Sequence, residues 1–240
     1  DLLASSPGNV STTQTFSLNI SAANLGFGTS PVRVDHATEA FVADDAGITL
    51  TGTLNAVATA TASATVERLS ADIALVSAAI ASSEARVDGR TRAYVGSGAS
   101  LAAGGDALLF ANAPDLRASS EEADLSLSIL GGDRLEPEAV VAQDVEASTA
   151  GDASVSARDL SLTAFSVADA RARVDSASFS ALGSINRVVP EASVLGSTRA
   201  SAGGSLATRN LTASADAART AVADTNLVGI SVFASGAAAD

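Results

Sequence analysis

The sequence contains no cysteine, no tryptophan and no methionine, and its 240 residues include only one tyrosine and seven phenylalanines. Without cysteine there is no disulfide framework, no thiolate nucleophile and no cysteine-based zinc site. Apolar residues nevertheless make up 47% of the chain, and alanine supplies much of that share. A compact globular core is normally filled with bulky side chains. An alanine-rich core therefore indicates a narrow interior in which backbones lie close together.

Lysine is also missing, so arginine supplies all 14 basic residues, against 27 acidic residues and a net charge of −13. Phosphate binding needs a basic surface, so we do not expect nucleic acid as a partner. An anionic membrane surface is disfavoured for the same reason, and no apolar run of ~20 residues predicts membrane insertion. The acidity fits solubility and mutual repulsion in a long polymer. A calcium-loaded surface is the alternative, although no liganding motif is present.

Internal repeats dominate the sequence. Residues 38–59 align without a gap with residues 91–112 at an offset of 53, so that Ala40-Phe41-Val42 matches Ala93-Tyr94-Val95. A third copy covers 145–164 and a fourth covers 198–215, and each copy is followed by a more variable half. The chain thus holds about four and a half units of roughly 50 residues.

Within each unit the apolar residues recur with a period of two. Between residues 54 and 66 every even position is apolar, and the odd positions are mostly polar. From Ala168 to Val174 the alternation is the same, and after Ser176 its phase flips to Ala177 and Phe179. A period of two is typical of strands that turn one set of side chains inward and the other toward solvent. The pattern outweighs the intrinsic helix preference of alanine.

Glycines interrupt the chain every few residues, often in pairs such as Gly104-Gly105 and Gly203-Gly204, which suits tight turns. Short strands, tight turns and a ~50-residue repeat predict an all-β fold, a right-handed parallel β-helix (β-solenoid). If each unit makes two or three coils, the rod is roughly 50 Å long at ~4.8 Å per coil. We expect residues 1–240 to form a single continuous segment with these parts: a partial repeat 1–31 and repeats 32–84, 85–138, 139–191 and 192–240.

Residues 91–113 resemble a repeat of very large bacterial surface proteins, the filamentous haemagglutinin-like and leukotoxin-type filamentous adhesins. The resemblance is carried by Ala93-Tyr94-Val95, by the turn Gly96-Ser97-Gly98-Ala99 and by Ala103-Gly104-Gly105-Asp106. It extends over most of residues 32–240 through degenerate copies. The family resemblance implies a secreted or surface-anchored β-helix used as a stalk or adhesive shaft, located outside the cell or on its surface. The missing start methionine leads us to expect an excerpt or a processed piece.

We found no pattern that predicts a catalytic, cofactor-binding or metal site, and we expect no enzyme. The single histidine, His36, has no second histidine or nucleophile motif beside it, so a turn or surface histidine is the interpretation. Tyr94 aligns with Phe41 and is expected to be a packing residue. The acidic pairs Asp44-Asp45, Glu121-Glu122 and Asp133 with Glu136 could serve glycoside chemistry. We interpret them as solvated turn carboxylates.

Three functions follow as hypotheses. The first is a non-catalytic structural or adhesive shaft whose partners are neighbouring repeats of a larger chain and possible ligands on a host or neighbouring cell. The second is a self-assembling filament or sheath subunit, because uncapped end coils expose strand edges to a homo-polymer partner. The third is a carbohydrate-binding or polysaccharide-active β-helix, which the scarcity of aromatic residues disfavours.

Overall fold

The protein is all-β in the computed structural model, which describes residues 1–231 and 235–239; these residues form strands, turns and bends and no helix. Three strands exceed forty residues in length, and short strands separate the long ones. In chain order the strands are β1 (Leu2–Val42), β2 (Gly47–Leu50), β3 (Leu54–Val95), β4 (Ser100–Ala103), β5 (Ala107–Thr149), β6 (Ser154–Ser156), β7 (Asp159–Val188), β8 (Glu191–Leu195), β9 (Thr198–Ser201), β10 (Ser205–Ala207), β11 (Asn210–Ser231) and β12 (Ser235–Ala239).

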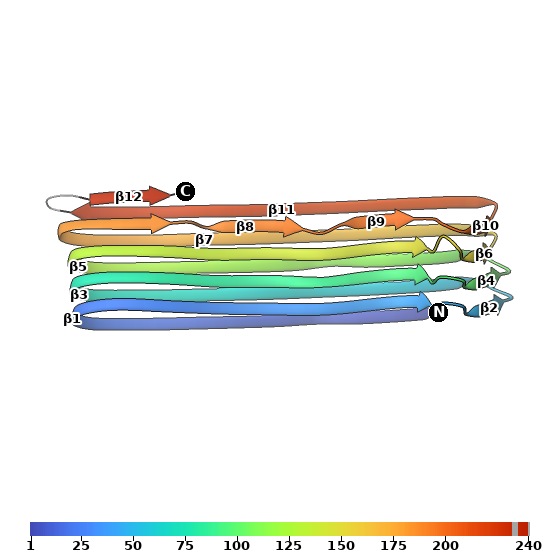
Figure 1. The fold of residues 1–240 in the computed structure, drawn as a ribbon, viewed down its shortest axis with the longest axis horizontal. Coiled ribbons are helices and arrows are strands. Elements are labelled where there is room, and N and C mark those ends of the chain that lie inside the picture. The colour runs from blue at the N-terminus through green and yellow to red at the C-terminus, as the bar shows by residue number, and fades with distance from the viewer. Residues whose placement is uncertain (232–234, 240) are drawn as a thin grey trace.

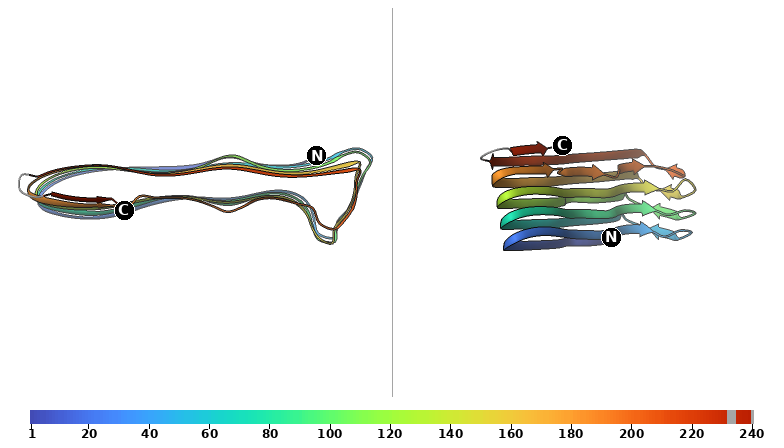
Figure 2. Two further views of the ribbon diagram at one scale, coloured as in Figure 1. Left: turned by 90° about the horizontal axis from the view of Figure 1, so that it is seen from above. Right: turned by 60° about the vertical axis from the view of Figure 1, so that its left-hand side comes forward.

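The long strands pair in parallel in the order β1-β3-β5-β7-β11, and the short strands form a second parallel sheet in the order β10-β6-β4-β2. Each of β1, β3 and β5 runs to one end of the molecule, doubles back and returns above or below the same path (Figure 1). Seen along the stack, successive circuits superpose on one long, flat outline (Figure 2). We call each circuit a level and number the levels from β1 (level 1) through β3, β5 and β7 to β11 (level 5).

The pairing register reproduces the sequence alignment. Ala40, Phe41 and Val42 pair with Ala93, Tyr94 and Val95, an offset of 53. One repeat therefore makes one level, so the condition of two or three coils per repeat, on which the length of roughly 50 Å depended, is not met. The reason is that each strand segment runs far before it reverses, so one circuit uses a whole repeat. Five levels at ~4.8 Å spacing give a stack about 20 Å high, with the long dimension across the stack.

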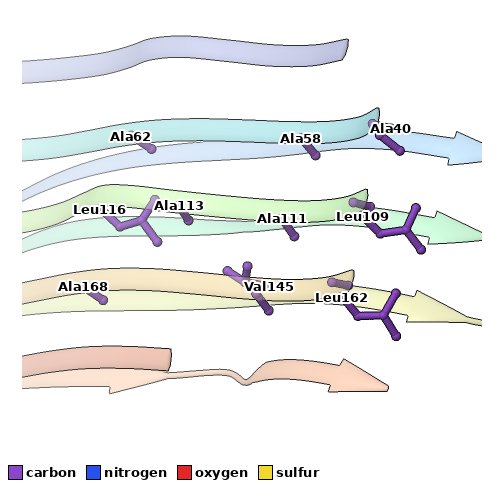
Figure 3. Close-up of a cluster of buried hydrophobic side chains, with 14 of the residues drawn as sticks. Ala40, Ala58, Ala62, Leu109, Ala111, Ala113, Leu116, Val145, Leu162 and Ala168 are labelled. Atoms are coloured by element: carbon purple, nitrogen blue, oxygen red, sulfur yellow. The ribbon is translucent and has the colours of Figure 1, made fainter. Parts of the chain in front are cut away.

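The predicted alternation is confirmed for residues 54–66. Every even position from Leu54 to Val66 is buried, and the side chains between them are partly exposed. The same position is often alanine at successive levels, as in the column Ala58, Ala111 and Ala164, whose members are fully buried. Figure 3 shows the small side chains of Ala58 and Ala111 on neighbouring levels, together with the larger Leu109 and Leu162. Alanine is required because the outgoing and returning halves of each level lie close together.

The turn between the long and short strands uses the predicted acidic and glycine residues. Asp44 and Asp45 lie in the turn before β2, where the Asp44 carboxylate accepts a 2.8 Å hydrogen bond from the backbone N–H of Ser97 one level above. Asp45 and Gly98 both have φ near +60°, a conformation that glycine adopts without strain. The turns therefore stack on each other as the strands do.

Arginine and acidic residues pair along the outer face. Several arginines bind an acidic side chain two residues away on the same strand, for example Arg171 with Asp169 and Arg117 with Asp115. Residues two apart face the same side of a strand, so this spacing places the charges next to each other. Exposed pairs of this kind contribute little to stability, because water and salt screen the charges. These pairs make the outer surface polar more than they stabilise the fold.

The alanine columns lead to a first prediction. Replacing Ala111 with leucine inserts three carbons between strands that have no space for them. We expect Ala111→Leu to lower the free energy of unfolding by about 1–3 kcal/mol in urea titrations followed by circular dichroism. The control Asn112→Leu, one residue along and facing outward, should change it by less than about 0.5 kcal/mol. Equal losses in both variants would contradict the narrow interior.

Candidate functional site

The end of the stack at which the long strands turn back, here called the reversal end, differs from the rest of the molecule. In level 2 the turn lies at Leu75 and Val76, two consecutive exposed residues between buried Ala74 and buried Ser77. Exposed residues 129–130 and 181–182 lie at the corresponding points of levels 3 and 4. The reversal end is therefore built by equivalent residues at successive levels.

A switch in the sequence alternation precedes each reversal. In level 2 the apolar residues Val66 and Leu69 are three positions apart, and in level 4 Val174 and Ala177 are too. No register shift accompanies either switch, so the strand continues with an unbroken two-residue alternation of faces. Val66 and Val174 consequently face inward, whereas Leu69 faces outward. Beyond the switch, most interior positions are polar and most exterior positions are apolar.

The interior of the reversal end is a stacked group of polar side chains, here called the polar interior. Its members come from outgoing and returning halves of levels 1 to 4 and are all less than a tenth exposed: Asn24, Ser70, Asp72, Ser77, Glu122, Asp124, Ser126, Asp133, Ser176, Ser178, Ser180, Ser184 and Asn186.

Hydrogen bonds link these side chains between and within levels. The Ser70 hydroxyl of level 2 donates to the Asp124 carboxylate of level 3. The Asn24 amide of level 1 donates to Asp72 of level 2 at 2.6 Å. In level 4 the Asn186 amide donates to the Ser178 hydroxyl at 2.8 Å. These bonds join neighbouring levels and the two halves of one level.

The buried carboxyl groups bind protons more tightly than exposed ones. Burial, reinforced by the negative charge of Asp133, raises the pKa of Asp124 to about 7. Burial also raises the pKa of Asp133, of Glu122 and of Asp72. Arg68 carries the nearby positive charge and opposes the rise at Asp72 and Glu122, while its guanidinium donates to the Gly28 carbonyl at 3.0 Å. Within the polar interior, Asp124 therefore binds a proton near neutral pH.

The outer surface of the same end is apolar. Large side chains that are 38–71% exposed lie over the outgoing halves of all five levels, and Ile20, Ile73, Leu127, Phe179 and Ile230 form one column of them. Beside them a groove of about 410 Å³ runs over Phe16 and Leu69 and is bordered by Glu67, Glu121 and Arg173. A contiguous apolar surface of this kind is uncommon on a monomeric soluble protein.

The acidic residues of the sequence fall in different environments. Glu121 is exposed on β5, whereas Glu122 faces the interior and is 3% exposed. Asp133 is buried, and Glu136 faces outward and pairs with Arg134. The interpretation as solvated turn carboxylates holds for Asp44 and Asp45, and it is wrong for Glu122 and Asp133. The reason is that these residues lie within strands, where neighbours point to opposite faces.

His36 lies within β1 and not in a turn, so that part of its prediction is wrong. Its half-buried side chain lies against Gly89 of level 2. If position 89 carried a side chain, the Cβ of that residue would lie 2.6 Å from the imidazole Nδ1 of His36. Burial lowers its pKa. Tyr94 stacks on Phe41 with ring centroids 5.2 Å apart, which confirms the packing role.

The sequence reasoning did not single out Asp72, Asp124 or Arg68. The sequence does contain a signal for the polar interior, which is the three-residue spacing between Val66 and Leu69. This spacing indicates an exchange of faces only if the strand continues without a break. No group of three or more histidine, aspartate or glutamate residues within 1–231 and 235–239 is arranged to hold a metal ion. The carboxyl groups of the polar interior can hold and share protons, and their burial separates them from solvent.

The raised pKa values predict that acid stabilises the protein. A carboxyl group whose pKa is higher in the folded state than in the unfolded state binds more protons when the protein is folded. For Asp124 the free energy of unfolding is therefore highest below the unfolded pKa of 3.8, and it falls as the pH rises toward about 7. Asp124→Asn removes a charge that must otherwise be buried. The rise from 3.8 to about 7 is about three pKa units at about 1.4 kcal/mol each, so we expect this variant to gain up to about 4 kcal/mol at pH 8 and little at pH 4.

Urea unfolding at pH 4, 6 and 8 tests this expectation. Asp216→Asn, at an exposed position of β11, is the control and should follow the wild-type pH dependence. A wild-type stability that rises steadily from pH 4 to pH 8, with Asp124→Asn parallel to it, would refute the assignment.

Comparisons of the chain with protein-family models, with curated proteins and with solved structures give no match.

Proposed function

We propose that the chain is a segment of a right-handed parallel β-helix (β-solenoid) that forms a non-catalytic structural or adhesive shaft of a large secreted or cell-surface bacterial protein. The observation that carries the proposal is the continuous parallel register, in which equivalent residues of successive repeats pair from one level to the next. A parallel connection of this type is right-handed in about 98% of cases.

The contacts between levels support a shaft. The long strand β3 packs against β1 and β5, and β5 packs against β3 and β7. Such a molecule is quasi-one-dimensional, so its length is set by the number of repeats and each repeat is stabilised by its neighbours. A shaft needs length and stiffness, both of which stacking provides. The sequence resemblance to filamentous adhesins points in the same direction.

A self-assembling filament or sheath subunit is the second candidate. It is favoured by the strand edges at the two ends of the stack: β1 pairs along its length with β3, and β11 with β7. Within the described residues the outer edges of β1 and β11 are not paired, and they present backbone N–H and C=O groups that another strand can bind. End-to-end growth would give rods of increasing length in electron micrographs, whereas the shaft hypothesis gives particles of one length.

Deleting one whole repeat tests the proposed architecture. Removing residues 85–138 joins Glu84 to Ala139, the register partner of Ala85, so the stack can close over the gap. We expect a shorter protein with the same β circular dichroism signal per residue and a cooperative thermal transition. The control, removal of residues 85–111, shifts the register by half a circuit and should abolish folding. Loss of the β signal in the whole-repeat deletion would overturn the proposal.

A further inference from the structure

The outgoing half of the reversal end carries two neighbouring outward columns that contain no charged residue. One is the Ile20 column, which begins with Ile20 at level 1 and ends with Ile230 at level 5. The other, here called the Leu18 column, lies one outward position closer to the short strands. Its members are Leu18, Ala71, Leu125, Ala177 and Val228. We call the two columns together the apolar face.

We propose that the apolar face binds a basic amphipathic helix of another protein. Such a helix presents an apolar stripe to the two columns, and its lysine or arginine side chains reach carboxylates at the margin of the face. The inference rests on the stacked register and on the charges beside the face, and it does not depend on the proposed shaft role.

Two glutamates at the margin of the apolar face favour a cationic partner. Glu67 and Glu121 occupy one outward column at levels 2 and 3, in register and ~4.8 Å apart, so their charges repel each other. The Gln14 amide donates to Glu67 at 2.6 Å but carries no charge. Arg173 follows Glu121 in the column, and its guanidinium binds Asp175 at 3.0 Å. Within the described residues neither glutamate forms an ion pair, so a cation from a partner would neutralise both.

The overall charge points to the same partner. The chain carries a net charge of −13, which repels a second copy, an acidic protein or an anionic lipid surface and attracts a basic partner. On the returning half, the outward column that begins with Phe27 and Ile80 continues into Arg134 and Arg187. The outgoing half therefore combines an uncharged apolar surface with an acidic margin, and the returning half does not.

The apolar face has hollows into which side chains of a partner can project. A hollow of about 250 Å³ lies over Ala177 between Leu125 and Val228. Another of about 410 Å³ lies on the Ile20 column. The groove of about 410 Å³ that is bordered by Glu67 and Glu121 lies between these glutamates and the Leu18 column. Apolar and cationic side chains of one partner can therefore be received side by side.

A helix matches the spacing of the levels better than an extended segment does. Side chains on one face repeat every ~5.4 Å along a helix and every ~6.8 Å along a strand, whereas the levels repeat every ~4.8 Å. A helix inclined by about 27° to the stack advances one level per turn and drifts ~10 Å sideways over five levels, which keeps it on the two columns. A strand would need an inclination of about 45° and would leave the face.

Fluorescence anisotropy of the full chain with two labelled synthetic peptides of about 14 residues, long enough to span five levels, tests the proposal. Both peptides place leucine at i, i+3, i+4 and i+7, and the other positions are lysine in one peptide and glutamate in the other. At an ionic strength of ~0.15 M, where charges are screened beyond ~8 Å, we expect saturable binding of the lysine peptide. The glutamate peptide, and a scrambled lysine peptide without the leucine stripe, should bind at least about ten-fold more weakly.

A matched pair of double variants locates the cationic contact. Glu67→Gln combined with Glu121→Gln removes the margin charges and should weaken binding of the lysine peptide about five-fold. The control combines Glu84→Gln with Glu138→Gln, an in-register pair at the same two levels on the returning half. This control changes the net charge equally and should leave the affinity within about two-fold of the wild type, because distant charges are screened.

A matched pair of single variants locates the apolar contact. Leu125→Ser removes the central side chain of the Leu18 column and should weaken binding of the lysine peptide about ten-fold. Ile80→Ser is the control, because Ile80 is 43% exposed against 49% for Leu125 but lies on the returning half. Its affinity should equal that of the wild type. Circular dichroism confirms that each variant is folded.

Several results would overturn the proposal. These are a wild type that binds neither peptide or both equally, equal losses in the two glutamate double variants, and unchanged binding by Leu125→Ser. A wild-type dimer in sedimentation velocity that Leu125→Ser abolishes would assign the face to a second copy. Flotation with phosphatidylcholine vesicles that Leu125→Ser abolishes would assign it to lipid. Either assignment would reject the helix as the occupant.

These outcomes are distinct from those of the repeat deletion. A folded whole-repeat deletion together with a wild type that binds neither peptide would retain the β-helix and reject the helix-binding face. A misfolded deletion together with a wild type that binds the lysine peptide would do the reverse.

Discussion

The parallel hydrogen-bond register that runs unbroken from level to level is the constraint on which the rest of this structure depends. A strand held on both sides by neighbours at a fixed offset cannot rotate its side chains to suit its own sequence, because a one-residue slip would turn every side chain to the other face. At the three-residue spacing between Val66 and Leu69, the strand keeps its alternation and the apolar residues emerge on the outside. The sequence pattern changes phase, and the backbone does not.

This constraint divides each level into two regions of opposite character. Toward the short strands, alanine, valine and leucine fill the interior, and arginine–aspartate pairs lie outside. At the reversal end, carboxyl, amide and hydroxyl groups fill the interior. Buried polar groups are costly unless they are hydrogen-bonded, and ionised carboxylates cost more than neutral ones. Protonation of Asp124 and its hydrogen bond from Ser70 reduce that cost, which ties the stability of the reversal end to pH.

The sequence predicted that the fold is all-β, and it predicted the offset between repeats. It also predicted which side chains face inward in the first half of each level. These depend on local alternation and on the match of Ala40-Phe41-Val42 to Ala93-Tyr94-Val95, both visible in one chain. The number of circuits per repeat was not predictable, because a two-residue period does not show where a strand reverses. The polar interior was missed for a related reason. A switch in phase can mean a bulge or an exchange of faces, and only the register distinguishes them.

The two regions must also differ in how they are stabilised. Burial of apolar surface contributes roughly 25 cal/mol per Å², and this gain is concentrated in the alanine-rich region. The reversal end buries polar groups and exposes apolar ones, so its order derives from backbone pairing with the levels above and below. Within the described residues, levels 1 and 5 have such a neighbour on one side only, which makes their reversal ends the least supported parts of this stack. Covering the apolar outer surface of the reversal end would return to this end the burial that its own interior does not provide. A contact on that surface would therefore stabilise the part of the fold that most needs it.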